Sequence, residues 1–407
     1  MKVQSKRGRL AIILIPFFII CFAVATTFLV LTAAKSDITE TERYQAVSAK
    51  HISWYENGEG YTVGDYNGWK NMKGSLEIPS SYKGKPVTRI NDWAFDGFYG
   101  LTSVTIPDTV TEIGDHAFSG CEGLTEIVIP DSVTSIGSSA FQDCASLTKV
   151  TLSSNLTILG EYAFSGCESL TIISIPESVT ELGPSAFYHC PIEEATIPVS
   201  FLGEVRNEFL KKVTITGEGS IKNDALSSCK NLTSVTMEKG ITSIGDRAFI
   251  YCEKLCEITI PEGVTRIGNF AFQNCESLKR INIPSTVTEV GVSAFLWCPI
   301  EQATLPLVAF DVHTHDDKAH LKSLVITNGS TLKDYALSGC SKITSVTLPS
   351  ELIYIGREAF YQCIALEDIY YQGTQAEWDL ITKGLFWDEQ IGDSYTIHCT
   401  DGDIPKA

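Results

Sequence analysis

The sequence lacks the short motifs that mark common enzyme sites. It has no HExxH zinc-protease pattern, no glycine-rich phosphate loop and no nucleophile elbow. Basic residues are also fewer than acidic ones: the chain has 31 Lys and Arg and 49 Asp and Glu, which gives a net charge of −18. Phosphate backbones and anionic lipid repel so acidic a chain, so we expect no nucleic-acid partner. No catalytic residue, no enzyme activity and no cofactor is predicted.

Charge is missing altogether from one segment near the N-terminus. Residues 10–34 carry no charged side chain. An apolar run of about 20 or more residues can cross a bilayer as a helix. The basic residues on its short side, which place the N-terminus in the cytoplasm, are Lys2, Lys6, Arg7 and Arg9. Everything after the run is then exported.

Two fates are open for this segment. The run is longer than the roughly 7 to 15 apolar residues of a cleaved signal peptide, which favours an uncleaved single-pass anchor with an extracellular C-terminal domain. Cleavage after Thr32-Ala33-Ala34 would instead give a secreted protein. Because residues 1–34 hold four basic and no acidic side chains, the net charge beyond them changes from −18 to −22.

Repetition dominates the rest of the chain. Between Trp93 and Phe360 it repeats Ala-Phe or Ala-Leu, then usually Cys, then Leu or Ile before a strand-like stretch that ends in Pro. The alanines of this phrase stand at 94, 117, 140, 163, 186, 225, 248, 271, 294, 336 and 359. The step between them is constant except from 186 to 225 and from 294 to 336, where each longer step hides one degraded unit. A period of about 20 to 29 residues with such fixed offsets predicts a leucine-rich-repeat solenoid whose units share one core.

Each unit should contain one strand and one compact reversal. In the copy AFSGCEGLTEIVIPDSVTSIG, Ile127 and Ile129 alternate as in a strand with one inward face, and Pro130 ends it. Ala140-Phe141 should pack a helical turn on the opposite side. The predicted class is an α/β repeat, a leucine-rich-repeat solenoid with a parallel strand stack on one face and short helical or 3-10 turns on the other. We expect thirteen strands from Val104 to Tyr371 and a capping strand at 75–78.

These patterns divide the chain into five parts. Residues 1–34 are the cytoplasmic tip with the transmembrane anchor or signal segment, 35–55 a linker, 56–92 an N-terminal cap, 93–371 the solenoid with inserts near 199–212 and 308–322, and 372–407 a C-terminal cap. A block of units is also duplicated, because the stretch that starts at Ala163 recurs from Ala271. Features that differ between the two blocks are the better guide to function.

Ten cysteines occupy one repeat position, namely Cys121, Cys144, Cys167, Cys190, Cys229, Cys252, Cys275, Cys298, Cys340 and Cys363. Disulfides or metal sites are one interpretation for an exported chain. The other is a small apolar residue that fills the same notch in every coil. The absence of CxxC or His partners at ligand spacing favours the second, with free, buried thiols. Cys256 breaks the row at a position that should face outward.

The second insert carries the only cluster with ligand character in the sequence. His313, His315 and His320 lie close together beside Asp316 and Asp317. Imidazole and carboxylate groups at this spacing can bind zinc or another transition metal. A solvated polar loop is the alternative, and it is favoured because the first insert has no His.

Outward strand positions carry the remaining candidates. One row, from Thr105 to Tyr370, is mostly Thr, which either suits exposed strands or offers hydroxyls to a ligand. Its neighbours vary from unit to unit, as on a recognition surface or on a merely solvated one. The binding-face candidates, which include two insert histidines, are Glu126, Lys149, Lys211, Lys212, Lys279, Arg280, His313 and His315.

The repeat AFxxCxxLxxVxIPxxVTxIG resembles the BspA-like, or Treponema pallidum type, family of bacterial leucine-rich-repeat surface proteins. The stretch IPSSYKGKPVTRINDWAF resembles the family's usual start, and Tyr370-Tyr371-Gln372-Gly373-Thr374 its terminal cap. The resemblance implies cell-surface or secreted proteins that bind host proteins, other cells or matrix. It brings no catalytic motif with it.

We therefore predict an exported, membrane-anchored protein that mediates protein–protein or adhesion-type interaction through a protein or glycan ligand. The first alternative is a passive spacer of the cell surface whose rod shape is its function. The second, an enzyme, would need a metal site in the His-containing insert.

Overall fold

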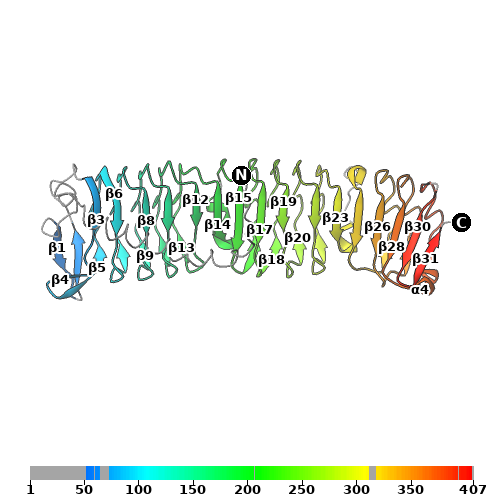
Figure 1. Ribbon diagram of the computed structural model, residues 1–407, viewed down its shortest axis with the longest axis horizontal. Helices are drawn as coiled ribbons and strands as arrows, with labels where there is room; N and C mark the ends of the chain where they lie inside the picture. The colour runs from blue at the N-terminus through cyan, green and yellow to red at the C-terminus, as the bar shows by residue number, and fades with distance from the viewer. Residues whose placement is uncertain are drawn as a thin grey trace, which may run out of the picture.

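The structure, a computed structural model, describes residues 52–58, 60–64, 73–205, 207–310, 318–392 and 394–405. These residues form a long rod of stacked coils (Figure 1). The predicted membrane segment at 1–34 lies outside the described residues. Within the part that is described, no helix combines the length and the apolar character needed to cross a bilayer.

One side of the rod is the predicted ladder of parallel strands. Its members are β3 (Lys73–Glu77), β6 (Gly100–Thr105), β8 (Glu126–Val128), β10 (Lys149–Thr151), β12 (Ile172–Ser174), β14 (Glu194–Pro198), β15 (Lys212–Thr216), β17 (Ser234–Met237), β19 (Glu257–Thr259), β21 (Arg280–Asn282), β23 (Gln302–Leu305), β24 (Ser323–Ile326), β26 (Ser345–Leu348), β28 (Asp368–Tyr371) and β30 (Thr396–Cys399). The thirteen strands predicted between Val104 and Tyr371 are all present, and β3 covers most of the expected capping strand. We call this side the first ladder.

A second ladder, which the sequence did not predict, forms where the VTxIG segments re-enter the core. It contains β2 (Tyr61–Gly64), β5 (Lys85–Ile90), β7 (Glu112–Ile113), β9 (Ser135–Ile136), β11 (Ile158–Leu159), β13 (Glu181–Leu182), β16 (Gly219–Ile221), β18 (Ile241–Ile244), β20 (Arg266–Ile267), β22 (Glu289–Val290), β25 (Thr331–Leu332), β27 (Tyr354–Ile355) and β29 (Thr382–Lys383). Most of its strands are very short, and neighbours within each of its three segments pair in parallel.

The third side is built of turns, so the predicted helical face is not confirmed. In each regular coil the residue before the Ala-Phe pair has positive φ, as at His116 with φ 53°, and so does the third residue after the Ala, as at Gly120 with φ 67°. Left-handed residues at this spacing break a helix, because helical geometry needs negative φ throughout. The freed N–H groups instead point to the next coil: Trp93 N donates to Asp115 O at 2.8 Å and Phe95 N to Ala117 O at 2.8 Å. We call this side the turn side.

Short helices occur in the two inserts and the C-terminal cap. The 3-10 helix η2 (Val199–Val205) leads from β14 directly to β15. The helices α3 (Leu307–Phe310) and η3 (Lys318–His320) occupy the same place between β23 and β24. Each insert thus replaces the second strand and the turn of one coil, which interrupts the second ladder between β13 and β16 and between β22 and β25. The first ladder pairs straight across both inserts.

A single apolar core runs along the rod. Its centre is a file of stacked rings, in which Phe118, Phe141 and Phe164 have centroids 5.3 and 5.1 Å apart and are fully buried. The ten repeat cysteines are buried beside this file and form no disulfide. Most of these thiols donate to a carbonyl of the preceding coil, as from Cys144 to Phe118 O at 3.3 Å. Burial raises the pKa of the Cys144 thiol to about 12, so the neutral form fills the notch.

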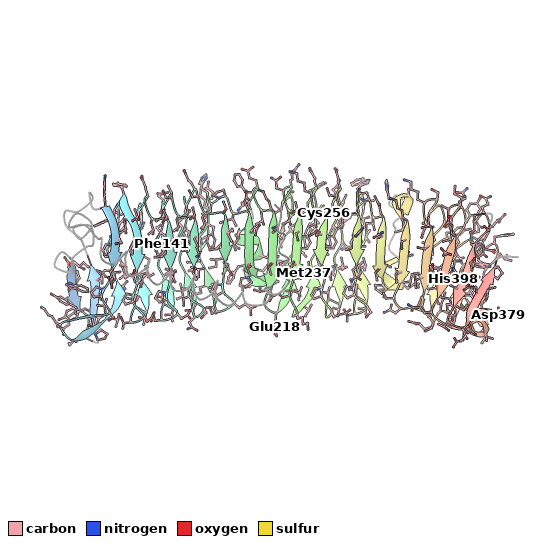
Figure 2. All side chains as sticks on the ribbon, viewed as in Figure 1. Phe141, Glu218, Met237, Cys256, Asp379 and His398 are labelled. Atoms are coloured by element: carbon pink, nitrogen blue, oxygen red, sulfur yellow. The ribbon has the colours of Figure 1, made fainter. Side chains whose placement is uncertain are left out.

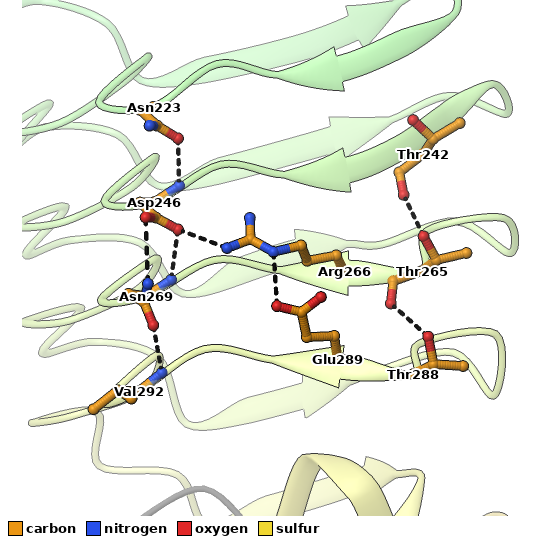
Figure 3. A network of polar contacts seen from close by, with 9 residues as sticks. All are labelled: Asn223, Thr242, Asp246, Thr265, Arg266, Asn269, Thr288, Glu289 and Val292. Carbon is orange, nitrogen blue, oxygen red and sulfur yellow. Dashed lines mark hydrogen bonds and ion pairs between the residues drawn. The ribbon is translucent and has the colours of Figure 1, made fainter.

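Polar side chains tie successive coils together at the turn that precedes the Ala-Phe pair (Figure 3). A side-chain oxygen of Asn223, Asp246 or Asn269 accepts a backbone N–H of the next coil, at 2.8, 2.9 and 2.8 Å. The pKa of Asp246 is lowered chiefly by the backbone N–H of Asn269. Thr265 and Thr288 likewise donate their hydroxyls to the carbonyl one coil earlier, at 3.2 and 3.3 Å. The side-chain oxygens of Asn223, Asp246 and Asn269 thus satisfy backbone N–H groups at the turn. The Thr hydroxyls add a second bond to carbonyls that already accept a backbone N–H.

Both ends of the rod are closed by antiparallel strands. β1 (Ser53–Glu56) pairs with β2, and β4 (Ser81–Tyr82) with β5, at one end. At the other, β30 pairs with β31 (Gly402–Pro405), and helix α4 (Gln375–Leu380) buries Trp378 against the last coils. A capping box between Thr374 and Glu377 starts this helix. The caps cover coil faces that would otherwise expose the core.

Candidate functional site

The outward side chains of the first ladder form a polar surface in which one hollow contains two of the predicted residues. This hollow, of about 820 Å³, spans β19, β21, β23 and β24, where pairing of the first ladder is interrupted between β19 and β21. Its polar lining includes Lys279, Arg280, Glu257, Asn282, Thr259 and Thr304. We call it the basic hollow, because it has two basic residues against one acidic residue on a chain of net charge −18.

The cations of the basic hollow differ in their partners. Lys279 Nζ lies 3.5 Å from a carboxylate oxygen of Glu301, which also pairs with Lys322 at 2.7 Å. The hydrogen bond from Lys322 lowers the pKa of Glu301. Among the described residues, Arg280 makes no ion pair. Its guanidinium therefore keeps its planar fork of donors available for a carboxylate or sulfate.

Two other basic candidates on this ladder, Lys211 and Lys212, are already paired. Lys211 Nζ lies 2.7 Å from Glu193, and Lys212 Nζ lies 3.0 Å from Glu194. Both pairs join adjacent strands at exposed positions, where such pairs contribute about 0 to 1 kcal/mol. The charges of Lys211 and Lys212 are thus balanced within the protein, so these residues are weaker candidates for binding an acidic partner.

The remaining pair of candidates lies by a second, acidic hollow. Glu126 on β8 stands opposite Lys149 on β10 in the strand register. The hollow, of about 620 Å³, is lined by Glu126 together with Asp108 and Asp131 and by no basic residue. The pKa of Asp131 is lowered by hydrogen bonds from the backbone N–H and hydroxyl of Ser154. One face of the rod thus carries hollows of opposite charge.

Cys256 is exposed, as its strand position predicts, and lies at the rim of the basic hollow. In other coils the same position holds Thr125, Thr148 or Thr233, whose hydroxyl donates to a backbone carbonyl of the preceding coil. The Cys256 thiol makes the equivalent contact with Thr233 O, at 3.5 Å. Figure 2 locates Cys256 and the core residue Phe141.

The His-containing insert is only partly described. His313 and His315 lie outside the described residues, and His320 ends helix η3 in an exposed position. Among the residues that the structure does describe, no group of three or more His, Cys, Asp or Glu side chains is placed to hold a metal ion.

A site that sequence reasoning missed is His398 on β30. Its Nε2 lies 2.9 Å from Asp368 and its Nδ1 2.9 Å from Asp403, and its ring stacks on Tyr370. The hydrogen bond with Asp368, followed by that with Asp403, raises the pKa of His398. The pairing of His398 with Asp368 left no signal in the repeat pattern, because the C-terminal cap departs from its period.

Stacked coils, a file of phenylalanines and parallel ladders define a leucine-rich-repeat β-solenoid. The family model of the BspA type leucine rich repeat region matches residues 88–216, 205–316 and 311–388, and the chain belongs to that family. The predicted resemblance is thus confirmed.

Several solved bacterial proteins are similar to this chain. A leucine-rich repeat protein of Bacteroides ovatus ATCC 8483 is 26% identical over 85% of this chain and 89% of its own, with a TM-score of 0.42. A leucine rich cell surface protein of Faecalibacterium prausnitzii A2-165 is 27% identical over 83% and 97%, with a TM-score of 0.37. The Treponema pallidum leucine rich repeat protein is 28% identical over 57% and 90%, with a TM-score of 0.35. No curated protein matches the chain.

Proposed function

We propose that this chain is an exported, membrane-anchored binding protein of the bacterial surface, and that the basic hollow on the first ladder holds an acidic segment of a protein ligand. Membership of the BspA-type family supports a role in protein–protein interaction. The uncharged run at residues 10–34 supports export and anchoring. No catalytic activity is part of this proposal.

The observation that carries the binding site is the charge of the basic hollow. Lys279 and Arg280 lie side by side in sequence on a chain of acidic net charge. Opposite charge at a concave patch raises association rates and selects orientation. Asn282, Thr259 and Thr304 add hydroxyl and amide groups that can bond the backbone of a bound peptide.

Charge reversal tests this site. Pull-downs with the soluble part from Lys35 onward, against host matrix proteins and bacterial surface polymers, should first identify the ligand. Lys279→Glu with Arg280→Glu should then weaken binding about tenfold or more. Each single reversal, Lys279→Glu and Arg280→Glu, is compared with Lys149→Glu, which reverses one charge at an exposed strand position outside the basic hollow. Equal binding by the parent and the double variant would exclude the hollow, and a failure to retain any partner would favour the spacer function.

Anchoring needs a separate test. The full chain should stay with membranes through an alkaline wash, whereas a chain that starts at Lys35 should be released. Mass spectrometry of the mature N-terminus separates the anchor from the cleaved signal: a protein that begins near Lys35 would show cleavage.

A further inference from the structure

Bulky aromatic residues occupy backbone positions on the turn side that disfavour them. Seven aromatic residues have φ between 54° and 62°: Trp93, Tyr162, Tyr251, Phe270, Trp297, Tyr335 and Phe386. Left-handed backbone favours Gly, Asn and Asp, and a bulky side chain there is an outlier. Other coils place Gly97, Gly120 or Gly166 at one of the two left-handed positions. The fold therefore accepts much smaller residues at these places.

Folding does not bury these rings either. Trp93 is 54% exposed and Tyr162 39% exposed, and Tyr188 in the next coil is 55% exposed. At the position of Trp93 and Tyr162, other coils carry Ser139 and Ser185, with φ 54° and 58°. A residue that is strained and also exposed contributes little to the core, and such outliers cluster at functional sites. The rings thus indicate a ligand rather than a packing role.

Trp93, Tyr162 and Tyr188 are three of the exposed rings on turns of the N-terminal half, and we call them the aromatic edge. Trp93 and Tyr162 have left-handed backbone, whereas Tyr188 does not and is included for its exposure alone. Trp93 is held flat by His116, with ring centroids 3.7 Å apart and planes 9° apart. Trp93 and Tyr162 lie three coils apart, about 14 Å at a strand spacing of about 4.8 Å. Tyr188 belongs to the coil after Tyr162, and its carbonyl accepts the N–H of Gly166 at 2.8 Å. The rings are therefore fixed to the backbone ladder rather than free to collapse together.

Polar side chains that reach solvent accompany these rings. Ser119 and Gln142 lie on turns between Trp93 and Tyr162 along the rod, and Glu161 precedes Tyr162 in an exposed position. A sugar ring has an apolar C–H face that stacks on an aromatic ring and a rim of hydroxyls that bond such side chains. Separate rings among polar groups suit a chain of sugars better than a protein, which would need a contiguous apolar patch.

Charge narrows the class of sugar. The exposed carboxylate of Glu161 stands next to one of the rings, and the whole chain has a net charge of −18. Both disfavour sulfated or sialylated sugars, because like charges repel at a binding surface. Neutral sugars carry no such penalty.

We propose that the aromatic edge binds neutral glycan chains, with one sugar ring stacked on each aromatic side chain. This surface lies on the turn side, away from the basic hollow of the first ladder. The two sites are therefore independent, and the failure of one leaves the other intact.

Serine substitutions test the proposal with residues that other coils already carry. Trp93→Ser and Tyr162→Ser introduce the residue found elsewhere at the same φ, and Tyr188→Ser matches Ser119 and Ser165. The full chain, in a detergent without a sugar headgroup, is titrated with hexamers of glucose, galactose, mannose and N-acetylglucosamine. Each substitution should weaken binding of the recognised hexamer by about two- to tenfold, the range expected for one stacked ring. Unfolding midpoints of the variants should match the parent, which shows that the fold is kept.

Lys279→Glu with Arg280→Glu is the matched control and should bind the hexamer as the parent does. Three results overturn the proposal: no neutral hexamer binds, the triple serine variant binds as well as the parent, or only sulfated oligosaccharides bind. Capture of a protein partner that depends on the three rings, with no sugar bound, would assign the aromatic edge to a protein interface and would overturn the glycan assignment too.

Discussion

At the residue scale, Phe141 packs against residues of the neighbouring coils. Its ring stacks between Phe118 and Phe164, which belong to the coils on either side. Those neighbours stand one repeat away in the sequence in each direction. The core of every coil is therefore completed by the next.

Removal of this ring should be costly. Phe141→Ala is expected to lower the free energy of unfolding by about 3 to 5 kcal/mol, because it leaves a cavity in the stack. Thr151→Ala, at an exposed position of β10, should cost well under about 1 kcal/mol. Chemical denaturation of the two variants measures both values. Comparable losses would mean that the inward and outward assignments are wrong.

Thiol chemistry should separate the repeat cysteines from Cys256. A membrane-impermeant maleimide, applied under anoxic conditions, should label Cys256 in the native protein and leave the ten buried thiols unreacted. Denaturation should then expose all of them. Mass spectrometry of labelled peptides gives the count for each site. Rapid native labelling of Cys144, or a disulfide between Cys121 and Cys144, would contradict the structure.

The sequence predicted the contents of the core well at this scale. The inward positions of Phe141, Cys144 and Ile127 follow from the alternation and the repeat, and all three are buried. The conformation of Trp93 or His116 did not follow, because residues of many kinds occupy that place. At the second left-handed position, the signals for positive φ were Gly97, Gly120, Gly166 and Gly339, with Asp143 and Asn274.

At the scale of elements, the second ladder was missed for a physical reason. Strands as short as Glu112–Ile113 contain too little alternation to be distinguished from a loop.

The ion pairs of the first ladder could not be predicted from the sequence either. The bond between Lys211 and Glu193 depends on the register of two strands that flank an irregular insert. Lys279 and Arg280 were predicted as binding-face residues and do lie together in one hollow.

A glycine follows most of the short strands of the second ladder, as Gly137 follows β9. A Cβ on Gly137 would lie 2.4 Å from a carboxylate oxygen of Asp115 and 2.7 Å from the Asp115 backbone N. Gly137→Ala should therefore destabilise the protein by about 1 to 3 kcal/mol, the usual range for overpacking. Gly203→Ala is the control, since its Cβ would meet nothing closer than 3.8 Å. Thermal unfolding compares the two variants. An unchanged midpoint for Gly137→Ala would mean that Asp115 does not lie as close to Gly137 as described.

The cap strand β30 should make stability depend on pH through His398. Because contacts with Asp368 and Asp403 raise its folded pKa, the protonated form is the one stabilised by folding. The contribution is complete below the unfolded pKa of about 6.5 and is lost as pH rises through the folded pKa. His398→Gln should remove this dependence. Unfolding midpoints measured at a series of pH values between about 6 and 9 test it, and parallel curves for the parent and the variant would exclude the mechanism.

On the scale of the whole molecule, the two degraded units mark the joints of the rod. Each insert removes one second-ladder strand and one turn, yet β14 still pairs with β15 and β23 with β24. The first ladder is thus paired across both inserts and is interrupted elsewhere, between β10 and β12 and between β19 and β21, whereas the second ladder is interrupted at the inserts themselves. The two long steps in the repeat predicted where these joints lie, but not which ladder would be broken, since no second ladder was expected.

The direction of the ladders has a mechanical consequence. Bonds between coils run along the rod, so a pull between its two ends loads the coils in series and peels them apart one by one. Each released coil frees one repeat, or about 75 Å of extended chain. Single-molecule stretching should therefore give a sawtooth of many small, evenly spaced events, whereas one large rupture would show that the coils fail together. Such a rod would lengthen under flow while its remaining coils, and any ligand bound to them, stay intact.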